Sequence, residues 1–287
     1  MAKVIRAQSA GFCMGVDLAL RKLNQVLEES LSQVSVCTLG PIIHNPQVLQ
    51  RYAALGVRQL QDPHEVPPGS KLVIRAHGVS RELHQALLQK GVQVVDATCP
   101  KVKKAQRLIA EQGKKGRSLL LFGEREHPEV AGLLSYAREQ AQVFESLQEL
   151  QGLDLKSGQA YFLAAQTTQD RREYNQIQEH LQARVDAQLP VFDTICDTTR
   201  QRQQEALQLA LQVDLVVVVG GYNSGNTRRL AQVVRSSGVQ GLHVQDQHDL
   251  PLQDLQGIPR IGLTAGASTP GDVIDKVQQA LERLDQS

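Results

Sequence analysis

The 287-residue sequence contains no tryptophan, and aromatic residues make up only 3% of it. Proteins that bind single-stranded nucleic acids stack the bases on aromatic side chains, so this scarcity argues against such a platform. The formal net charge is only +1, and therefore no overall field favours nucleic acid or membrane as a partner. No apolar run approaches the length of a membrane-spanning helix, and the N-terminal residues lack the apolar core of a signal peptide. We expect a cytoplasmic protein.

Cysteine is also scarce, and the four cysteines include no closely spaced Cys-x-x-Cys pair. A chain of this length buries a sizeable core without disulfides, which are rare in the cytoplasm. Cys13, Cys99 and Cys196 stand in similar contexts, each between a predicted strand and a helical pattern and at nearly even separations along the chain. This spacing indicates three similar units that each contribute one cysteine to a common centre. Cys37 lies inside a predicted strand, and we expect it to be a core residue.

Short β-branched segments alternate with helical patterns along the whole chain, which is typical of parallel α/β units. Each third contains, in order, a cysteine turn, a strand with a polar loop, a short strand, and a strand with a loop of small residues. We therefore predict an α/β fold of three lobes, each a small, mostly parallel sheet flanked by helices, with pseudo-threefold symmetry around a central site. The predicted lobes are residues 14–97, 98–192 and 193–287, with residues 1–13 joining the third.

Ligands of open parallel sheets bind beyond the carboxyl ends of the strands, and this rule selects the candidate site residues. Besides the cysteines, most of them are histidines beside Gly, Pro or Asn, hydroxyl residues and asparagines. Residues 220–227 form a glycine-rich turn before a helix, which favours an anion such as a phosphate or diphosphate. The residues selected are His44, Asn45, His77, Ser80, His127, Glu129, Thr167, Thr168, Asn223, Ser224, Asn226 and Ser268.

Glu129 and the three cysteines have two interpretations each. A carboxyl group held in a cleft can work as a general acid, whereas a glutamate at a helix start more often stabilises the helix dipole. Three cysteine thiolates suit zinc or an iron–sulfur cluster and leave one coordination position open. Free cysteines are, however, among the most buried residues in proteins, so three core cysteines remain the alternative.

Nine stretches, spread over nearly the whole chain, carry a further signal. They are Gly11–Val16, Ile43–Asn45, Ala76–Ser80, Asp96–Pro100, His127–Val130, Gln166–Thr168, Thr194–Cys196, Asn223–Thr227 and Thr264–Ser268. Together they resemble stretches of the 4-hydroxy-3-methylbut-2-enyl diphosphate reductases, which catalyse the last step of the methylerythritol phosphate route to isoprenoid precursors. Any one stretch is weak evidence, but their number, order and spacing make accidental agreement implausible.

The resemblance implies an oxidoreductase whose three lobes surround a [4Fe–4S] cluster. Cys13, Cys99 and Cys196 would each bind one iron, and the fourth iron would be open to the substrate. Reduction removes the substrate's hydroxyl group as water and gives isopentenyl diphosphate and dimethylallyl diphosphate. The family implies ferredoxin or flavodoxin as electron donor, and we expect a monomer that binds neither nucleic acid nor membrane.

The resemblance also assigns roles to the candidate residues. Glu129 would deliver a proton, Thr167 would orient the alcohol end of the substrate, and His127 joins them as a catalytic residue. Some relatives have a second serine where Gly225 stands, so its backbone is expected to bond the diphosphate. The substrate-binding set is His44, His77, His127, Thr167, Ser224, Gly225, Asn226 and Ser268.

Two other functions fit the motif pattern without the resemblance. One is a sensor that binds a phosphate ligand, holds a structural metal and performs no turnover, and such a protein needs neither Glu129 nor an open coordination position. The other is a cluster-free isomerase or transferase acting on a sugar phosphate. In that protein each cysteine could be replaced singly with only packing losses.

Overall fold

The structure is a computed structural model, which describes residues 3–30, 34–138 and 140–284. Its strands form three small parallel sheets flanked by helices, which confirms the predicted α/β class. The chain divides into two compact units. The first unit comprises Met1–Asp17, Ile43–Arg51 and Asp197–Ser287; the second comprises Leu18–Ile42 and Tyr52–Cys196.

The boundaries of the three lobes stay a prediction. Residues 1–2, 31–33, 139 and 285–287 of those predicted lobes lie outside the described residues. Within the described part of the chain, no helix is both long enough and apolar enough to cross a membrane.

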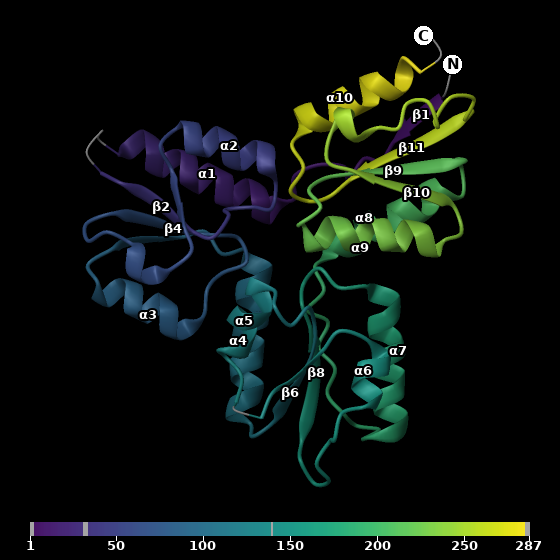
Figure 1. Cartoon of the computed structure of the whole chain (residues 1–287). Helices are drawn as coiled ribbons and strands as arrows, with labels where there is room; N and C mark the ends of the chain where they lie inside the picture. The colour runs from purple at the N-terminus through teal and green to yellow at the C-terminus, as the bar shows by residue number, and fades with distance from the viewer. Residues whose placement is uncertain (1–2, 31–33, 139, 285–287) are drawn as a thin grey trace. The chain divides into compact units, whose positions relative to one another are not determined.

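The first unit contains one sheet, here called sheet A, in the order β1-β11-β9-β10. Strand β1, near the N-terminus, pairs in parallel with β11, which lies almost at the other end of the chain (Figure 1). The strands are β1 (Lys3–Arg6), β9 (Leu215–Val219), β10 (Gln240–Val244) and β11 (Arg260–Ala265); the helices are α8 (Asp197–Ala210), α9 (Gly225–Ser236), α10 (Gly271–Glu282) and the 3₁₀ turn η2 (Gln247–Asp249).

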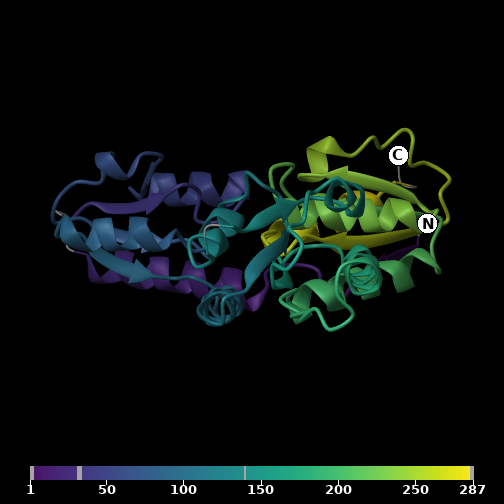
Figure 2. The same cartoon turned by 90° about the horizontal axis from the view of Figure 1, so that it is seen from below.

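Strand β9 has no polar residue because both faces of sheet A are covered by helices (Figures 1 and 2). Leu215, Val217 and Val219 pack in one cluster with apolar residues of α10. Val216 and Val218 point to the opposite face and pack with residues of α8 and α9. The alternation follows from the two-residue period of a strand.

The second unit contains two sheets. Sheet B has the order β3-β2-β4-β5, and sheet C has the order β7-β6-β8. The strands are β2 (Val36–Leu39), β3 (Arg58–Leu60), β4 (Lys71–Ile74), β5 (Gln93–Asp96), β6 (Ser118–Phe122), β7 (Gln142–Phe144) and β8 (Tyr161–Ala165). The helices are η1 (Pro63–Glu65), α3 (Arg81–Gln89), α4 (Pro100–Lys114), α5 (Pro128–Leu134), α6 (Leu147–Gln151) and α7 (Arg171–Arg184). Helices α1 (Met14–Glu29) and α2 (Pro46–Ala54) continue from the first unit into the second.

The segment before Cys196 corrects the sequence prediction, which treats it as a strand like those before the other two cysteines. Among the described residues, its only ladder contact is an isolated parallel bridge between Val191 and Leu163. The hydroxyl of Thr194 accepts the N–H of Ala165 at 2.7 Å and donates to its carbonyl at 2.6 Å. A side chain therefore satisfies the groups that a longer strand would pair with its backbone.

The sequence also predicts that Cys37 is a core residue, and this is confirmed. Its side chain is fully buried in β2 and packs in one cluster with Leu72 and Leu87. The Cys37 Sγ lies 3.5 Å from the hydroxyl of Ser35.

We predict that Cys37→Ala lowers the free energy of unfolding by about 1–2 kcal/mol, because it leaves a small void in the core. Leu211→Ala is the matched control, since Leu211 is 87% exposed and its truncation removes almost no buried surface. Urea unfolding of both variants measures the effect. Equal stability of the two variants would show that the site of Cys37 is not tightly packed.

Candidate active site

Cys13, Cys99 and Cys196 stand directly before helices α1, α4 and α8, and all three are partly buried and form no disulfide among the described residues. In each case the backbone N–H of the cysteine donates to a carbonyl two residues beyond the end of a strand, namely β11, β4 or β8. The same hydrogen bond therefore occurs three times, which supports the threefold repeat read from the sequence. The acceptors are Ala267 for Cys13 at 3.2 Å, Ala76 for Cys99 at 2.9 Å and Thr167 for Cys196 at 2.9 Å.

Glu129 lies in the first turn of α5 and is only 1% exposed. Both of its carboxylate oxygens bind Thr167: the backbone N–H donates to Oε1 at 2.7 Å and the hydroxyl donates to Oε2 at 2.9 Å. Burial raises the pKa of Glu129 to about 7, although the hydrogen bonds from Thr167 oppose the shift. The carboxyl group can therefore carry and release a proton near neutral pH.

His127 caps the same helix. Its Nδ1 accepts the backbone N–H of Glu129 at 3.1 Å, so in the neutral ring the hydrogen is on Nε2. The ring of His77 packs edge-on against it, with the ring centroids 5.0 Å apart. The second unit therefore brings together His77, His127, Glu129 and Thr167. Cys99 binds the carbonyl next to His77, and Cys196 binds the carbonyl of Thr167 itself.

Gln166 is a further candidate site residue beside Thr167, although the sequence pattern gives it no role. It is fully buried, and its Oε1 accepts the backbone N–H of Glu124 at 2.9 Å. Its Nε2 has no hydrogen-bond partner among the described residues. A buried unpaired donor is costly, so this amide is a candidate contact for a ligand. The sequence signal that points to Gln166 is its place in the stretch Gln166–Thr168, one of those that carry the family resemblance.

The first unit gathers the predicted anion-binding residues around the N-terminus of α9. Ser224 caps that helix by accepting the backbone N–H of Thr227 at 3.4 Å. The hydroxyl of Ser268 lies 3.3 Å from that of Ser224 and also donates to the carbonyl of His44 at 3.3 Å. In the described part of the chain, the buried Nδ2 of Asn226 has no hydrogen-bond partner. Hydroxyls, an unpaired amide and a helix N-terminus together favour an anionic ligand.

The glycine-rich turn before α9 allows this packing. A Cβ atom at Gly221 would lie 2.9 Å from the carbonyl oxygen of His44, so a larger residue would push the two segments apart. Gly225 is the first residue of the helix and presents its backbone at the N-terminus. Tyr222, between them, is held by a hydrogen bond from its hydroxyl to Asp249 at 2.9 Å and by edge-on contact with His243.

The structure thus places the predicted site residues in two groups, one in each unit. The first unit holds Cys13, His44, Ser224, Gly225, Asn226 and Ser268. The second holds His77, Cys99, His127, Glu129, Thr167 and Cys196.

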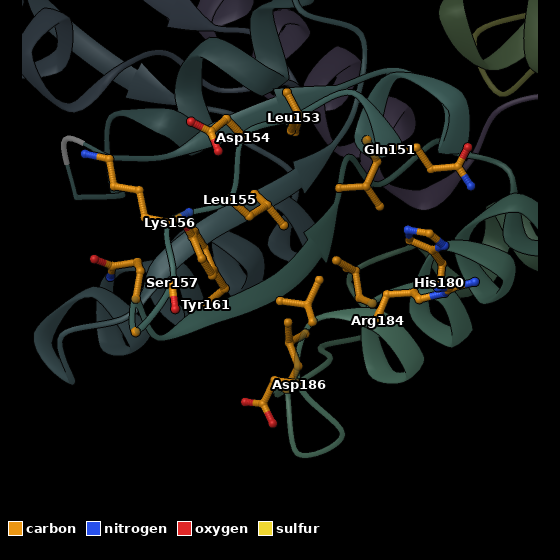
Figure 3. A pocket seen from close by; sticks show the side chains of 16 residues that line it. Gln151, Leu153, Asp154, Leu155, Lys156, Ser157, Tyr161, His180, Arg184 and Asp186 are labelled. Carbon is orange, nitrogen blue, oxygen red and sulfur yellow. The ribbon is translucent and has the colours of Figure 1, made fainter.

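A hollow of about 470 Å³ in the second unit is not part of this site (Figure 3). Its lining includes Tyr161, the first residue of β8, and it therefore lies at the opposite end of that strand from Thr167. Figure 3 shows the polar side chains of Lys156, His180 and Arg184 around it. None of the predicted site residues lines it.

Comparison with known proteins identifies the family. The model of the LytB protein family matches residues 4–282. The chain belongs to the LytB family. Relatives called 4-hydroxy-3-methylbut-2-enyl diphosphate reductase occur in Solidesulfovibrio magneticus, 55% identical over 98% of this chain and 99% of the relative, and in Nitratidesulfovibrio vulgaris strain DP4, 56% identical over the same shares. The sequence resemblance is therefore confirmed.

Solved structures agree with the family. The diphosphate reductase of Plasmodium falciparum is 26% identical, with a TM-score of 0.92 over 97% of this LytB chain and 87% of that one. A second structure, of (E)-4-hydroxy-3-methyl-but-2-enyl diphosphate reductase, described as the terminal enzyme of the non-mevalonate pathway, is 36% identical. Its TM-score is 0.70 over 99% and 100% of the two chains.

The raised pKa of Glu129 predicts a pH-dependent contribution to stability. The folded protein holds this proton more tightly than the unfolded chain, whose pKa is 4.5, so the contribution is complete below pH 4.5 and is lost as the pH rises through 7. It amounts to on the order of 3 kcal/mol.

We therefore expect the difference in unfolding free energy between the wild type and Glu129→Gln to change across this range, as measured by urea unfolding of metal-free protein. Glu126→Gln, an exposed neighbour, is the control and should track the wild type. A difference independent of pH would mean that Glu129 has an ordinary pKa.

Proposed function

We propose that this LytB protein removes the hydroxyl group of 4-hydroxy-3-methylbut-2-enyl diphosphate by reduction, in the last step of the methylerythritol phosphate pathway. The products are isopentenyl diphosphate and dimethylallyl diphosphate. The names of relatives that match it over nearly their full length support this substrate. The observation that carries the chemistry is the buried carboxyl group of Glu129, which accepts two hydrogen bonds from Thr167 and lies in the first turn of the helix that His127 caps.

The three cysteines fit a [4Fe–4S] cluster by their chemistry. They form no disulfide among the described residues, and each precedes a helix, whose N-terminus stabilises a thiolate. Cys13, Cys99 and Cys196 would hold the cluster and leave one iron without a cysteine ligand. When bound, the cluster supplies electrons and a Lewis-acidic iron.

The protein's own residues bind the diphosphate. Ser224, Asn226 and Ser268 offer donors at the N-terminus of α9, where Gly225 adds its backbone N–H. The helix dipole and these donors favour the negative charge of the ligand. His44, His77 and His127 complete the proposed binding set, and the geometry of His127 directs its Nε2–H away from the capped helix end.

Glu129 supplies a proton. The overall reaction consumes two electrons and two protons: one C–O bond breaks, the hydroxyl leaves as water, and a C–H bond forms at one of two carbons of the allyl group. A carboxyl group with a pKa of about 7 can release its proton at neutral pH and take up another from solvent. Thr167, which binds both carboxylate oxygens, holds the acid in place and offers its hydroxyl to the alcohol end of the substrate.

The proposal also includes an electron donor, a cellular location and an oligomeric state. An oxidoreductase of this kind needs a one-electron donor, and ferredoxin or flavodoxin would fill that role. A cytoplasmic location and a monomeric state follow the sequence expectation.

Turnover of the substrate tests the function directly. Protein purified and reconstituted with iron and sulfide without oxygen, then mixed with dithionite-reduced methyl viologen and the diphosphate, should form both products, as measured by mass spectrometry. Binding without conversion would support the sensor instead. Conversion by iron-free protein would contradict a role of the cluster in this reaction.

We predict that Glu129→Gln retains its iron but loses about 100-fold or more in kcat, because the proton donor is removed while the shape of the site is kept. The Glu126→Gln variant, which changes an exposed neighbour of the same type, should keep wild-type kcat. A Glu129→Gln enzyme with unchanged kcat would remove Glu129 from the mechanism.

A further inference from the structure

Arg202, on helix α8 in the first unit, is only 2% exposed. Its guanidinium donates two hydrogen bonds, both to backbone carbonyls: Nη1 to Ala265 at 2.5 Å and Nη2 to Gly11 at 2.9 Å. Its Nε has no hydrogen-bond partner among the described residues. A fully buried arginine is uncommon unless a negative charge compensates it.

The two carbonyls belong to the segments that position Cys13. Gly11 lies two residues before Cys13 in the chain. Ala265 lies two residues before Ala267, whose carbonyl accepts the backbone N–H of Cys13 at 3.2 Å. One planar guanidinium therefore ties together the two segments that meet at this cysteine.

The charge of Arg202 needs a counterpart. Burial lowers the pKa of Arg202, while the negative charges of Cys13 and then Glu205 act in the opposite direction. Glu205 accepts hydrogen bonds from the backbone N–H and the hydroxyl of Ser9 and keeps its negative charge, so it offsets part of the charge of Arg202. The arginine stays protonated at any ordinary pH, so a negative charge at Cys13 stabilises it and is stabilised by it.

We infer that Arg202 is a positioning residue for Cys13, and that its buried charge makes the cluster bound through Cys13 easier to reduce. The inference rests on the proposed function, since it needs a cluster held by the cysteines. Reduction adds negative charge to a cluster, and a fixed buried cation nearby stabilises the reduced form. Its two bonds to the backbone also hold the ligand loop in place before any metal arrives.

Arg202→Met and Arg202→Lys separate charge from position. Methionine has a similar length and no charge, whereas lysine keeps the charge but cannot bond both carbonyls in the same fork geometry. Arg200→Met is the matched control, because Arg200 lies two residues earlier on the same helix, is exposed and pairs with Asp197 at its surface. Circular dichroism of the cluster-free proteins checks that each variant folds.

Two readouts that do not depend on turnover carry the test: the midpoint potential from a redox titration followed by electron paramagnetic resonance, and the rate of iron release to a chelator. Arg202→Met should have a lower midpoint potential and release iron about 10- to 100-fold faster than wild type. Arg202→Lys should keep a potential near wild type and still release iron faster. Arg200→Met should match the wild type in both.

A potential and a release rate in Arg202→Met equal to those of Arg200→Met would overturn the inference. If Arg202→Met does not fold, the lysine variant decides: iron release as slow as in the wild type would overturn the positioning role. A wild-type protein that holds the cluster without converting the diphosphate would refute the proposed function. The midpoint potential and the rate of iron release would still test the role of Arg202 in that case.

Discussion

One hydrogen bond, repeated three times, organises this LytB protein. The backbone N–H of Cys13, Cys99 and Cys196 binds a carbonyl just beyond the carboxyl end of a strand, so each thiol is fixed where a loop enters a helix. Parallel pairing brings the chain to that place, because β1 and β5 lie beside β11 and β4, whose following loops supply the acceptors for Cys13 and Cys99. The segment before Cys196 pairs with β8 through a single backbone bridge, and the side chain of Thr194 bonds the N–H and the carbonyl of Ala165 in β8. The backbone N–H of Cys196 still donates the same hydrogen bond, to Thr167.

A second constraint is that several polar side chains are buried without enough hydrogen bonds to compensate for the loss of water. Glu129 is removed from water, and its two hydrogen bonds from Thr167 do not outweigh that cost, so its pKa lies near neutrality. Gln166, Asn226 and Arg202 each keep one buried donor atom without a partner among the described residues. A fold that leaves such groups unsatisfied sacrifices stability, and ligand binding is the usual compensation. Gln166 lies directly before Thr167, which binds the proposed proton donor; Asn226 lies in the helix that we propose to bind the diphosphate; and Arg202 binds the loop before Cys13.

Much of the fold follows from sequence pattern alone. The uniformly apolar run of β9 and the core position of Cys37 can be predicted because each depends on the local sequence pattern. Helix α6 escapes such analysis because five residues are too few to show a period. The burial of Arg202 also could not be predicted from the sequence, because α8 is largely polar and no local feature distinguishes Arg202 from the exposed Arg200. The roles of the site residues came from resemblance, because they depend on tertiary contacts that no local pattern encodes.

We propose that three equivalent cysteines hold an iron–sulfur cluster, and the decisive experiment is iron and sulfide analysis of protein purified without oxygen. We expect about four of each per chain in the wild type and in Cys37→Ser, whose cysteine lies in a core strand. We expect the cluster to be lost in Cys13→Ser, Cys99→Ser and Cys196→Ser. Well-folded wild-type protein that stays free of iron after reconstitution, or full iron content in the three variants, would show that these cysteines do not hold a cluster.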